Sequence, residues 1–156
     1  PNLNEFRKSL NQLSAAAGGD KPEDVASAIH ATVHDLRWRQ ENTARLAILI
    51  GDAAPHLDYR DQNYSYDVDA LHAAARGIKI FPVGASGLEP EGEYIFRQMA
   101  QLTGGKFVFL TYKDGKNASS GPGYDTNLNV QNYSVETLDK LVVRLVRDEL
   151  GQLARR

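Results

Sequence analysis

The sequence predicts an α/β domain built on a doubly wound, mostly parallel sheet with helices on both faces. Three short apolar runs at residues 45–51, 78–83 and 106–110 have the continuous hydrophobic character of strands that are covered on both sides. Stretches with helical spacing of apolar residues lie before, between and after them. Because right-handed crossovers through intervening helices favour such an order, we expect the three strands to be parallel and adjacent in sequence order.

Two helices are predicted before the first strand. An apolar stripe from Phe6 to Leu13 recurs at helical spacing and predicts a helix that stops at Gly18-Gly19. A second helix is predicted over residues 22–38, with Pro22 in its first turn. Trp38 is expected to anchor the end of this helix against the sheet.

Three further helices follow the first strand. The pattern predicts helices over residues 67–76 and 91–102, which Gly77 and Gly104 would stop. Ser134 is expected to open a last helix that runs through Leu150. Strands and helices therefore alternate along the chain from residue 45 onward.

Composition limits the classes of protein to which the chain can belong. Its 156 residues are 42% hydrophobic and 24% charged, which predicts a single domain over residues 1–156 with a sizeable core. The 18 basic residues are scattered among 20 acidic ones, so no basic patch for nucleic acid is expected. No apolar run is long enough to span a membrane, so we expect neither a membrane span nor a leader segment in these residues. The absence of cysteine excludes disulfides and thiolate chemistry but leaves the compartment undecided.

Residues 111–133 form a long polar segment rich in Gly, Asn and Ser, with three tyrosines. Loops of this length are uncommon in compact domains and are often functional or disordered. Tyrosine among small polar residues suits adaptable contacts with another protein. We therefore expect either a surface loop or a protein-contact loop at this place.

Asp52 directly follows the first apolar strand, in the stretch "ARLAILIGDAAPH". In parallel α/β sheets, ligands bind beyond the carboxyl ends of the strands. Asp is also a frequent turn residue, and its carboxylate can cap the turn that follows. Asp52 is therefore either a turn cap or a ligand at the functional edge of the sheet.

The stretches "RLAILIGDAAPH", "AAARGIKIFPVGAS" and "EYIFRQMAQLTGGKFVFL" resemble the C-terminal portion of a von Willebrand factor type A (vWA) domain. The resemblance covers about residues 18–153. It implies a Rossmann-like sheet that carries a metal-ion-dependent adhesion site, in which Mg²⁺ and an acidic group of a protein partner meet. Asp52 matches the family's aspartate after its fourth strand, which holds the ion through water.

Two departures from the family pattern concern the metal site. The Asp-x-Ser-x-Ser loop of the family does not occur in the sequence, so the N-terminal strands that carry it are expected to be absent from this chain. In "GGDKPED", Asp20 stands near the position of the family's second-loop threonine, and Asp20 with Glu23 also forms a capping box for the second helix. The expected Mg²⁺ ligands are therefore Asp52 and Asp20, which form an incomplete site with weak affinity.

The histidines are weaker candidates for a metal site. His30 and His34 have the i, i+4 spacing of zinc-binding helices, but no Glu follows the first of them, so a polar helix face is the favoured interpretation. His56 is expected to be a solvent-facing loop residue, and at most an outer neighbour of an oxygen-ligated ion.

The resemblance and the motifs together predict a non-catalytic protein-interaction module with an incomplete metal-ion-dependent adhesion site. The alternatives are a Rossmann-like nucleotide-binding domain or enzyme, or a vWA remnant that binds no metal. A nucleophile-elbow motif fails at Ser86, because the spacing is Gly-x-Ser-Gly and no histidine follows residue 72. Without its neighbour in the family, the strand at residues 45–51 would expose an apolar edge, so we expect it to pair with an N-terminal segment or with a second copy of the chain.

Overall fold

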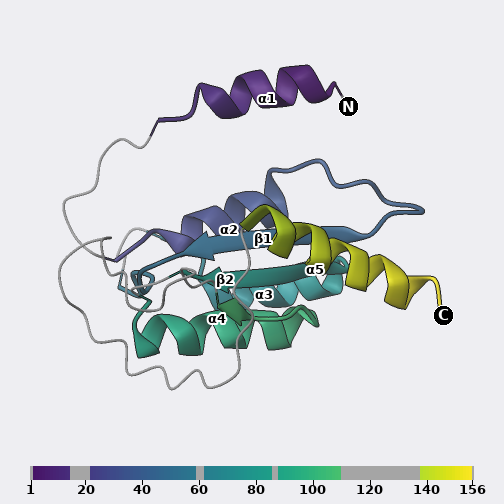
Figure 1. The fold of residues 1–156 in the computed structure, drawn as a ribbon. Helices are drawn as coiled ribbons and strands as arrows, with labels where there is room; N and C mark the ends of the chain where they lie inside the picture. The colour runs from purple at the N-terminus through teal and green to yellow at the C-terminus, as the bar shows by residue number, and fades with distance from the viewer. Residues whose placement is uncertain (1, 15–21, 59–61, 86–87, 110–137, 156) are drawn as a thin grey trace, which may run out of the picture.

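The computed structural model describes residues 2–14, 22–58, 62–85, 88–109 and 138–155. Within these ranges the chain has a mixed α/β fold, with five helices and one three-stranded sheet (Figure 1). The elements in chain order are α1 (Leu3–Asn11), α2 (Val25–His34), β1 (Arg45–Gly51), α3 (Tyr66–Ala75), β2 (Ile78–Gly84), α4 (Pro90–Thr103), β3 (Val108–Phe109) and α5 (Leu138–Leu153). The long polar segment at residues 111–133 lies outside the described residues.

The three strands are parallel and lie in the order β1-β2-β3, which confirms the predicted sheet. β1 pairs with β2 along its whole length, from Arg45 opposite Ile78 to Gly51 opposite Gly84. β3 is much shorter and pairs only with the carboxyl end of β2. In the described part of the chain, β1 is therefore an edge strand and β2 is the central one.

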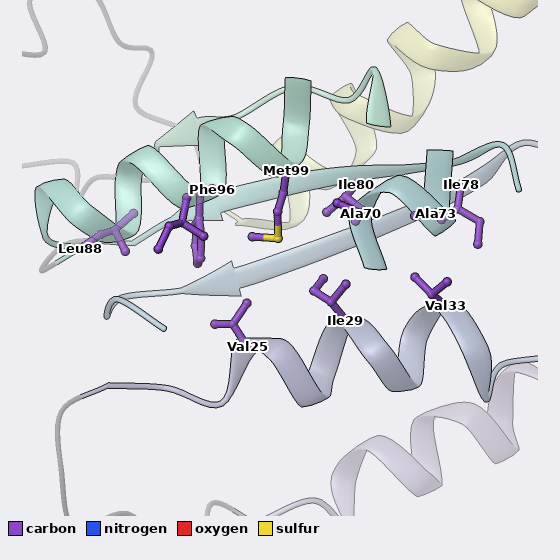
Figure 2. Close-up of a cluster of buried hydrophobic side chains, with 11 residues drawn as sticks. Val25, Ile29, Val33, Ala70, Ala73, Ile78, Ile80, Leu88, Phe96 and Met99 are labelled. Atoms are coloured by element: carbon purple, nitrogen blue, oxygen red, sulfur yellow. The ribbon is translucent and has the colours of Figure 1, made fainter. Parts of the chain in front are cut away.

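The core lies on both faces of β2. Ile78 and Ile80 point to the face covered by α2, α3 and α4, whereas Phe81 and Val83 point to the face covered by α5. This alternation follows from the two-residue period of a strand. In Figure 2, Val25, Ile29 and Val33 project from α2 toward the side chains of the sheet and of the neighbouring helices. Helices on both faces are thus confirmed.

The connection between α4 and β3 explains why β3 begins at Val108 rather than at the predicted residue 106, whereas the predicted end at residue 110 lies outside the described residues. The hydroxyl of Thr103 accepts a hydrogen bond from the backbone N–H of Ile80 at 3.0 Å and donates one to the Met99 carbonyl at 2.8 Å. Gly105 lies so close to β2 that a Cβ there would come within 1.8 Å of the Ile80 carbonyl oxygen. A side chain and a tight turn therefore occupy the edge of β2 where a longer strand would pair.

The predicted second helix is shorter at both ends. α2 begins at Val25, and its N-cap is Asp24, whose carboxylate accepts the Ser27 backbone N–H at 3.1 Å. The predicted capping box of Asp20 and Glu23 is therefore wrong, because the helix starts too late for it. α2 ends at His34, yet Trp38 still anchors its end: the indole packs against the core and donates to the Thr32 carbonyl at 2.7 Å.

The first predicted helix also differs from the structure. α1 ends at Asn11 rather than at Gly18-Gly19, and none of its residues is buried. Its apolar stripe is exposed, and α1 lies apart from the sheet in Figure 1. An isolated helix gains no packing energy that would extend it, which accounts for its shortness.

The later helix ends agree with the predictions. α3 stops before Gly77 and α4 stops before Gly104, and both glycines adopt a φ of 66°. This left-handed conformation favours glycine and terminates a helix. The expected start of the last helix at Ser134 lies outside the described residues, within which α5 begins at Leu138. No helix of the described part combines the length and apolar character that a membrane crossing requires.

The hydroxyl of Thr103 provides a first test of this fold. Replacing it in Thr103→Val leaves the buried N–H of Ile80 without an acceptor, which should lower the free energy of unfolding by about 1–3 kcal/mol. Thr103→Ser keeps the hydroxyl and should retain most of the stability. Urea unfolding of the two variants checks this. Equal loss in both would show that the hydrogen bond does not carry the effect.

The N-cap of α2 provides a second test. Burial raises the pKa of Asp24, but hydrogen bonds from Ser27 and Gln62 outweigh it and hold that pKa below its ordinary value. A lowered carboxyl pKa stabilises the fold above the unfolded pKa of about 4, and this contribution is lost as the pH falls through the folded pKa.

Asp24→Ala removes the cap and should cost about 1 kcal/mol of unfolding free energy at pH 7. Asp24→Asn keeps the cap without the charge. The difference in unfolding free energy between this variant and the wild type should therefore shrink as the pH falls from about 5 to about 3. Urea unfolding across this pH range measures both effects. A pH-independent difference between the wild type and Asp24→Asn would contradict the assignment.

Candidate functional site

The turn after β1 presents Asp52 at the carboxyl end of the sheet. Ala53, Ala54 and Pro55 are buried, whereas Asp52 is exposed. The carboxylate of Asp52 makes no hydrogen bond or ion pair with any residue in the described part of the chain. It does not cap the turn there, so it stays accessible to a cation from solvent.

The segment that precedes α2 is held against this turn. The backbone N–H of Glu23 donates to the Ala54 carbonyl at 3.0 Å, and the backbone N–H of His56 donates to the Glu23 carbonyl at 3.0 Å. Glu23, at the start of the described segment, therefore lies beside the turn that carries Asp52. Asp20 itself lies outside the described residues.

The N-terminal turn of α4 packs on the other side of the same turn. A Cβ at Gly92 would lie 3.0 Å from the Ala54 Cα, so only a glycine allows the helix to approach so closely. Glu91 and Glu93 stand in the first turn of α4, where they offset the positive end of the helix dipole. Negative charge at this helix start disfavours a phosphate ligand.

His56 differs from its prediction as a solvent-facing residue. Only 17% of its side chain is exposed, and its Nδ1 lies 3.7 Å from the Asp58 carboxylate. It follows the buried Ala-Ala-Pro turn and shares in its packing. His56 thus lies close in sequence to the Asp52 edge, in a partly buried setting.

A second group of polar side chains, which we call the histidine cluster, joins α2 to α3. It consists of His30, His34, Asp69 and His72, and so contains three of the four histidines in the chain. His30 Nδ1 lies 2.9 Å from Asp69 Oδ2, and His34 Nε2 lies 2.8 Å from Asp69 Oδ1. His72 Nδ1 is 3.4 Å from Asp69 Oδ1.

Helical spacing explains how these side chains meet. His30 and His34 are one turn apart on α2, and Asp69 and His72 are three residues apart on α3, so each pair shares a helix face. The two faces pack together because Ile29 and Val33 of α2 and Ala73 of α3 belong to one buried cluster.

Asp69 is the buried centre of the histidine cluster. It is 1% exposed, and the only ion-pair partners it has in the described residues are the three histidines. A buried carboxylate is costly unless it is hydrogen-bonded and its charge is compensated. The histidine ring nitrogens supply hydrogen bonds to it, and a bound cation would compensate its charge.

Tyr64 and Ser27 form an outer layer around His30. The Tyr64 ring stacks on the His30 ring with 4.0 Å between centroids and 16° between planes. The Tyr64 hydroxyl lies 2.9 Å from the Ser27 hydroxyl, which also accepts a hydrogen bond from Gln62 at 3.1 Å. These contacts fix the orientation of the His30 imidazole.

His30 and His34 do lie on a partly exposed polar face of α2, and the structure adds a buried partner for that face, Asp69 of α3. About a third of each side chain is exposed, at 35% and 34%, and each has a ring nitrogen on a buried carboxylate. Sequence reasoning did not single out Asp69, although a signal was present: Asp69 lies one helical turn before Ala73, on the face of small residues that packs inward.

A hollow of about 500 Å³ lies at the opposite, amino end of the sheet, where Trp38, Gln40 and Arg45 contribute to its lining. The Arg45 guanidinium donates to the carbonyls of Arg39, Gln40 and Arg76, each at 2.6 Å. Its donors are thus occupied in holding the chain together. This arginine is a structural clamp rather than an anion-binding group.

Comparison with known proteins gives no family assignment. No protein-family model matches the chain, and no curated protein matches it. Conclusions about function therefore rest on the Asp52 edge and on the histidine cluster.

Proposed function

We propose that the chain is a non-catalytic protein-interaction module of the vWA type, which engages a protein partner through a divalent cation held at the Asp52 edge. The observation that carries this proposal is the exposed Asp52 carboxylate, which is without hydrogen bonds in the described residues and follows the edge strand β1. The carboxyl edge of a parallel sheet is the usual place for a ligand.

The chemistry of this edge suits a hard cation. Mg²⁺ prefers oxygen ligands, keeps several of its waters and is often held by only one or two carboxylates. Asp52 supplies one carboxylate, and Asp20 is the second candidate from the sequence. An acidic group of the partner would complete the shell. Because this chain offers so few ligands, its own affinity for Mg²⁺ should be weak.

A nucleotide-binding function is the competing proposal. It would need a phosphate near the turn between β2 and α4, where Glu91 and Glu93 place negative charge at the helix start. This charge favours the interaction module over the nucleotide binder. The two proposals differ in which ligand raises the melting temperature of the chain. For an interaction module, an adenine nucleotide alone should have no effect on it.

The role of Asp52 can be tested with Mn²⁺, a paramagnetic substitute for Mg²⁺. Low Mn²⁺ concentrations should broaden the amide signals of Ala53, Ala54 and Glu23 in an NMR spectrum of the labelled chain, because these backbone groups surround Asp52. Asp52→Asn should abolish this broadening. Asp35→Asn, which changes an exposed aspartate at the other end of α2, should leave it intact.

Broadening that survives in Asp52→Asn would overturn the proposed site. Ions at the histidine cluster would instead broaden the signals of α3, so the two groups are distinguishable in the same spectrum. A rise in melting temperature with nucleotide but not with Mn²⁺ would favour the competing proposal.

The free edge of β1 is the second part of the proposed interaction surface. Ile50 is 49% exposed, and one edge of β1 has no strand partner among the described residues. An open apolar edge invites pairing with another strand. We infer that an N-terminal segment or a second copy of the chain pairs there in the native assembly.

Hydrogen exchange tests this pairing. In a parallel sheet, alternate residues of β1 bond to β2 and the others face the free edge. If the edge is paired in the native assembly, all amides from Ala47 to Ile50 should exchange slowly. Fast exchange at alternate positions in a monodisperse monomer would show that the edge is open.

A further inference from the structure

We propose that the histidine cluster is a binding site for a first-row transition metal ion, with Zn²⁺ as the ion that fits its donors. The ligands are His30 Nδ1, His34 Nε2 and the Asp69 carboxylate. The site lies between α2 and α3 and uses no residue of the Asp52 edge. It therefore stands or falls independently of the function proposed above.

The spacing of the donor atoms matches a metal site. One ligand atom from each of the three residues lies within 4.8 Å of the others. A tetrahedral Zn²⁺ with bonds of about 2.1 Å holds its ligand atoms about 3.4 Å apart. The two imidazoles bond different oxygens of Asp69, at 2.9 and 2.8 Å. A carboxylate that binds the ion through one of these oxygens would lengthen that nitrogen–oxygen distance by about half an ångström as the ion replaces the bridging proton.

The donor types select the metal. Two imidazoles and one carboxylate form a mixed nitrogen and oxygen set, which suits Zn²⁺, whereas Mg²⁺ prefers oxygen alone. Three protein ligands leave a fourth position for water. His72 is the nearest further group, with its Nδ1 3.4 Å from Asp69 Oδ1, and it can orient the carboxylate through a hydrogen bond.

The burial of Asp69 provides an independent reason for a cation. Its side chain is 2% exposed, and neither lysine nor arginine pairs with it in the described part of the chain. A dipositive ion would compensate the charge of this carboxylate, and it would accept a lone pair from each of the two neighbouring imidazoles. Because His30 and His34 keep a third of their surface in contact with solvent, the ion also has a path to the site.

The surroundings of His30 resemble the outer support that metal-binding imidazoles require. Tyr64 stacks on its ring, and the Tyr64 hydroxyl is hydrogen-bonded to Ser27, which lies on α2 like His30. Such neighbours fix the direction of a ligand before the ion arrives. Bound metal would join α2 to α3 and so stabilise the folded chain.

Zinc titration of the metal-free chain tests the proposal. The chain is stripped with a chelator and titrated with zinc chloride by calorimetry, and its melting temperature is followed. We expect one Zn²⁺ per chain and a higher melting temperature with zinc. Co²⁺ in place of Zn²⁺ should give the intense visible absorption of a four-coordinate ion. Both readouts are independent of any activity.

Three variants locate the site. Asp69→Asn and His34→Asn should each lower the zinc affinity by at least about 100-fold, since even outer-shell changes cost 10–100-fold. His56→Asn removes the one histidine outside the cluster and should leave the affinity unchanged. Circular dichroism of the metal-free variants checks that they fold. Should buried Asp69→Asn fail to fold, the partly exposed His34→Asn carries the test alone.

Three outcomes would overturn the proposal. The first is a folded wild-type chain that takes up no zinc, which would make the cluster a purely hydrogen-bonded link between the helices. The second is zinc affinity that His34→Asn leaves unchanged. The third is an equal loss of affinity in His56→Asn, which would place the ion elsewhere.

Discussion

Burial of β2 on both faces is the constraint on which the other features depend. Every residue of this strand except Lys79 is buried, and Lys79 itself forms an ion pair with Glu149 of α5. A strand in this position needs a helical layer on each side, because apolar groups on both faces must leave water. Helices α2, α3 and α4 cover one face and α5 covers the other. Because the strands are parallel, their carboxyl ends all lie at one edge of the sheet.

Both candidate sites follow from this layering. The carboxyl edge collects the turn with Asp52, the segment before α2 and the start of α4, which are held together by the backbone bonds of Glu23 and the close approach of Gly92. Because α2 and α3 cover the same face of the sheet, they pack against each other, and two histidines of α2 contact a buried aspartate of α3. One site offers an exposed carboxylate to a hard cation, and the other offers nitrogen donors in a half-buried setting. Their different chemistry suits different ions.

The features that the sequence predicts well are those set by local pattern. Continuous apolar runs identify all three strands, and glycines that need a positive φ mark the ends of α3 and α4.

Features decided by contacts between distant residues were missed. The start of β3 depends on the hydroxyl of Thr103 against Ile80, and the ligand set of the histidine cluster depends on α2 packing against α3. In the sequence Asp69 resembles an ordinary surface acid. Only its position one helical turn before Ala73, on the same face of α3, indicates that it is buried. The N-cap of α2 at Asp24 rather than Asp20 likewise follows from the bonds that hold Glu23 to Ala54.

A metal ion is the counter-charge that we propose for the buried carboxylate of Asp69. Anomalous diffraction at the zinc absorption edge, from crystals of the zinc-loaded chain, tests it most directly. We expect one strong peak between α2 and α3, within bonding distance of His30 Nδ1, His34 Nε2 and an Asp69 oxygen. A zinc peak only at His56 or at surface carboxylates, with the Asp69 hydrogen bonds to the histidines intact, would contradict it.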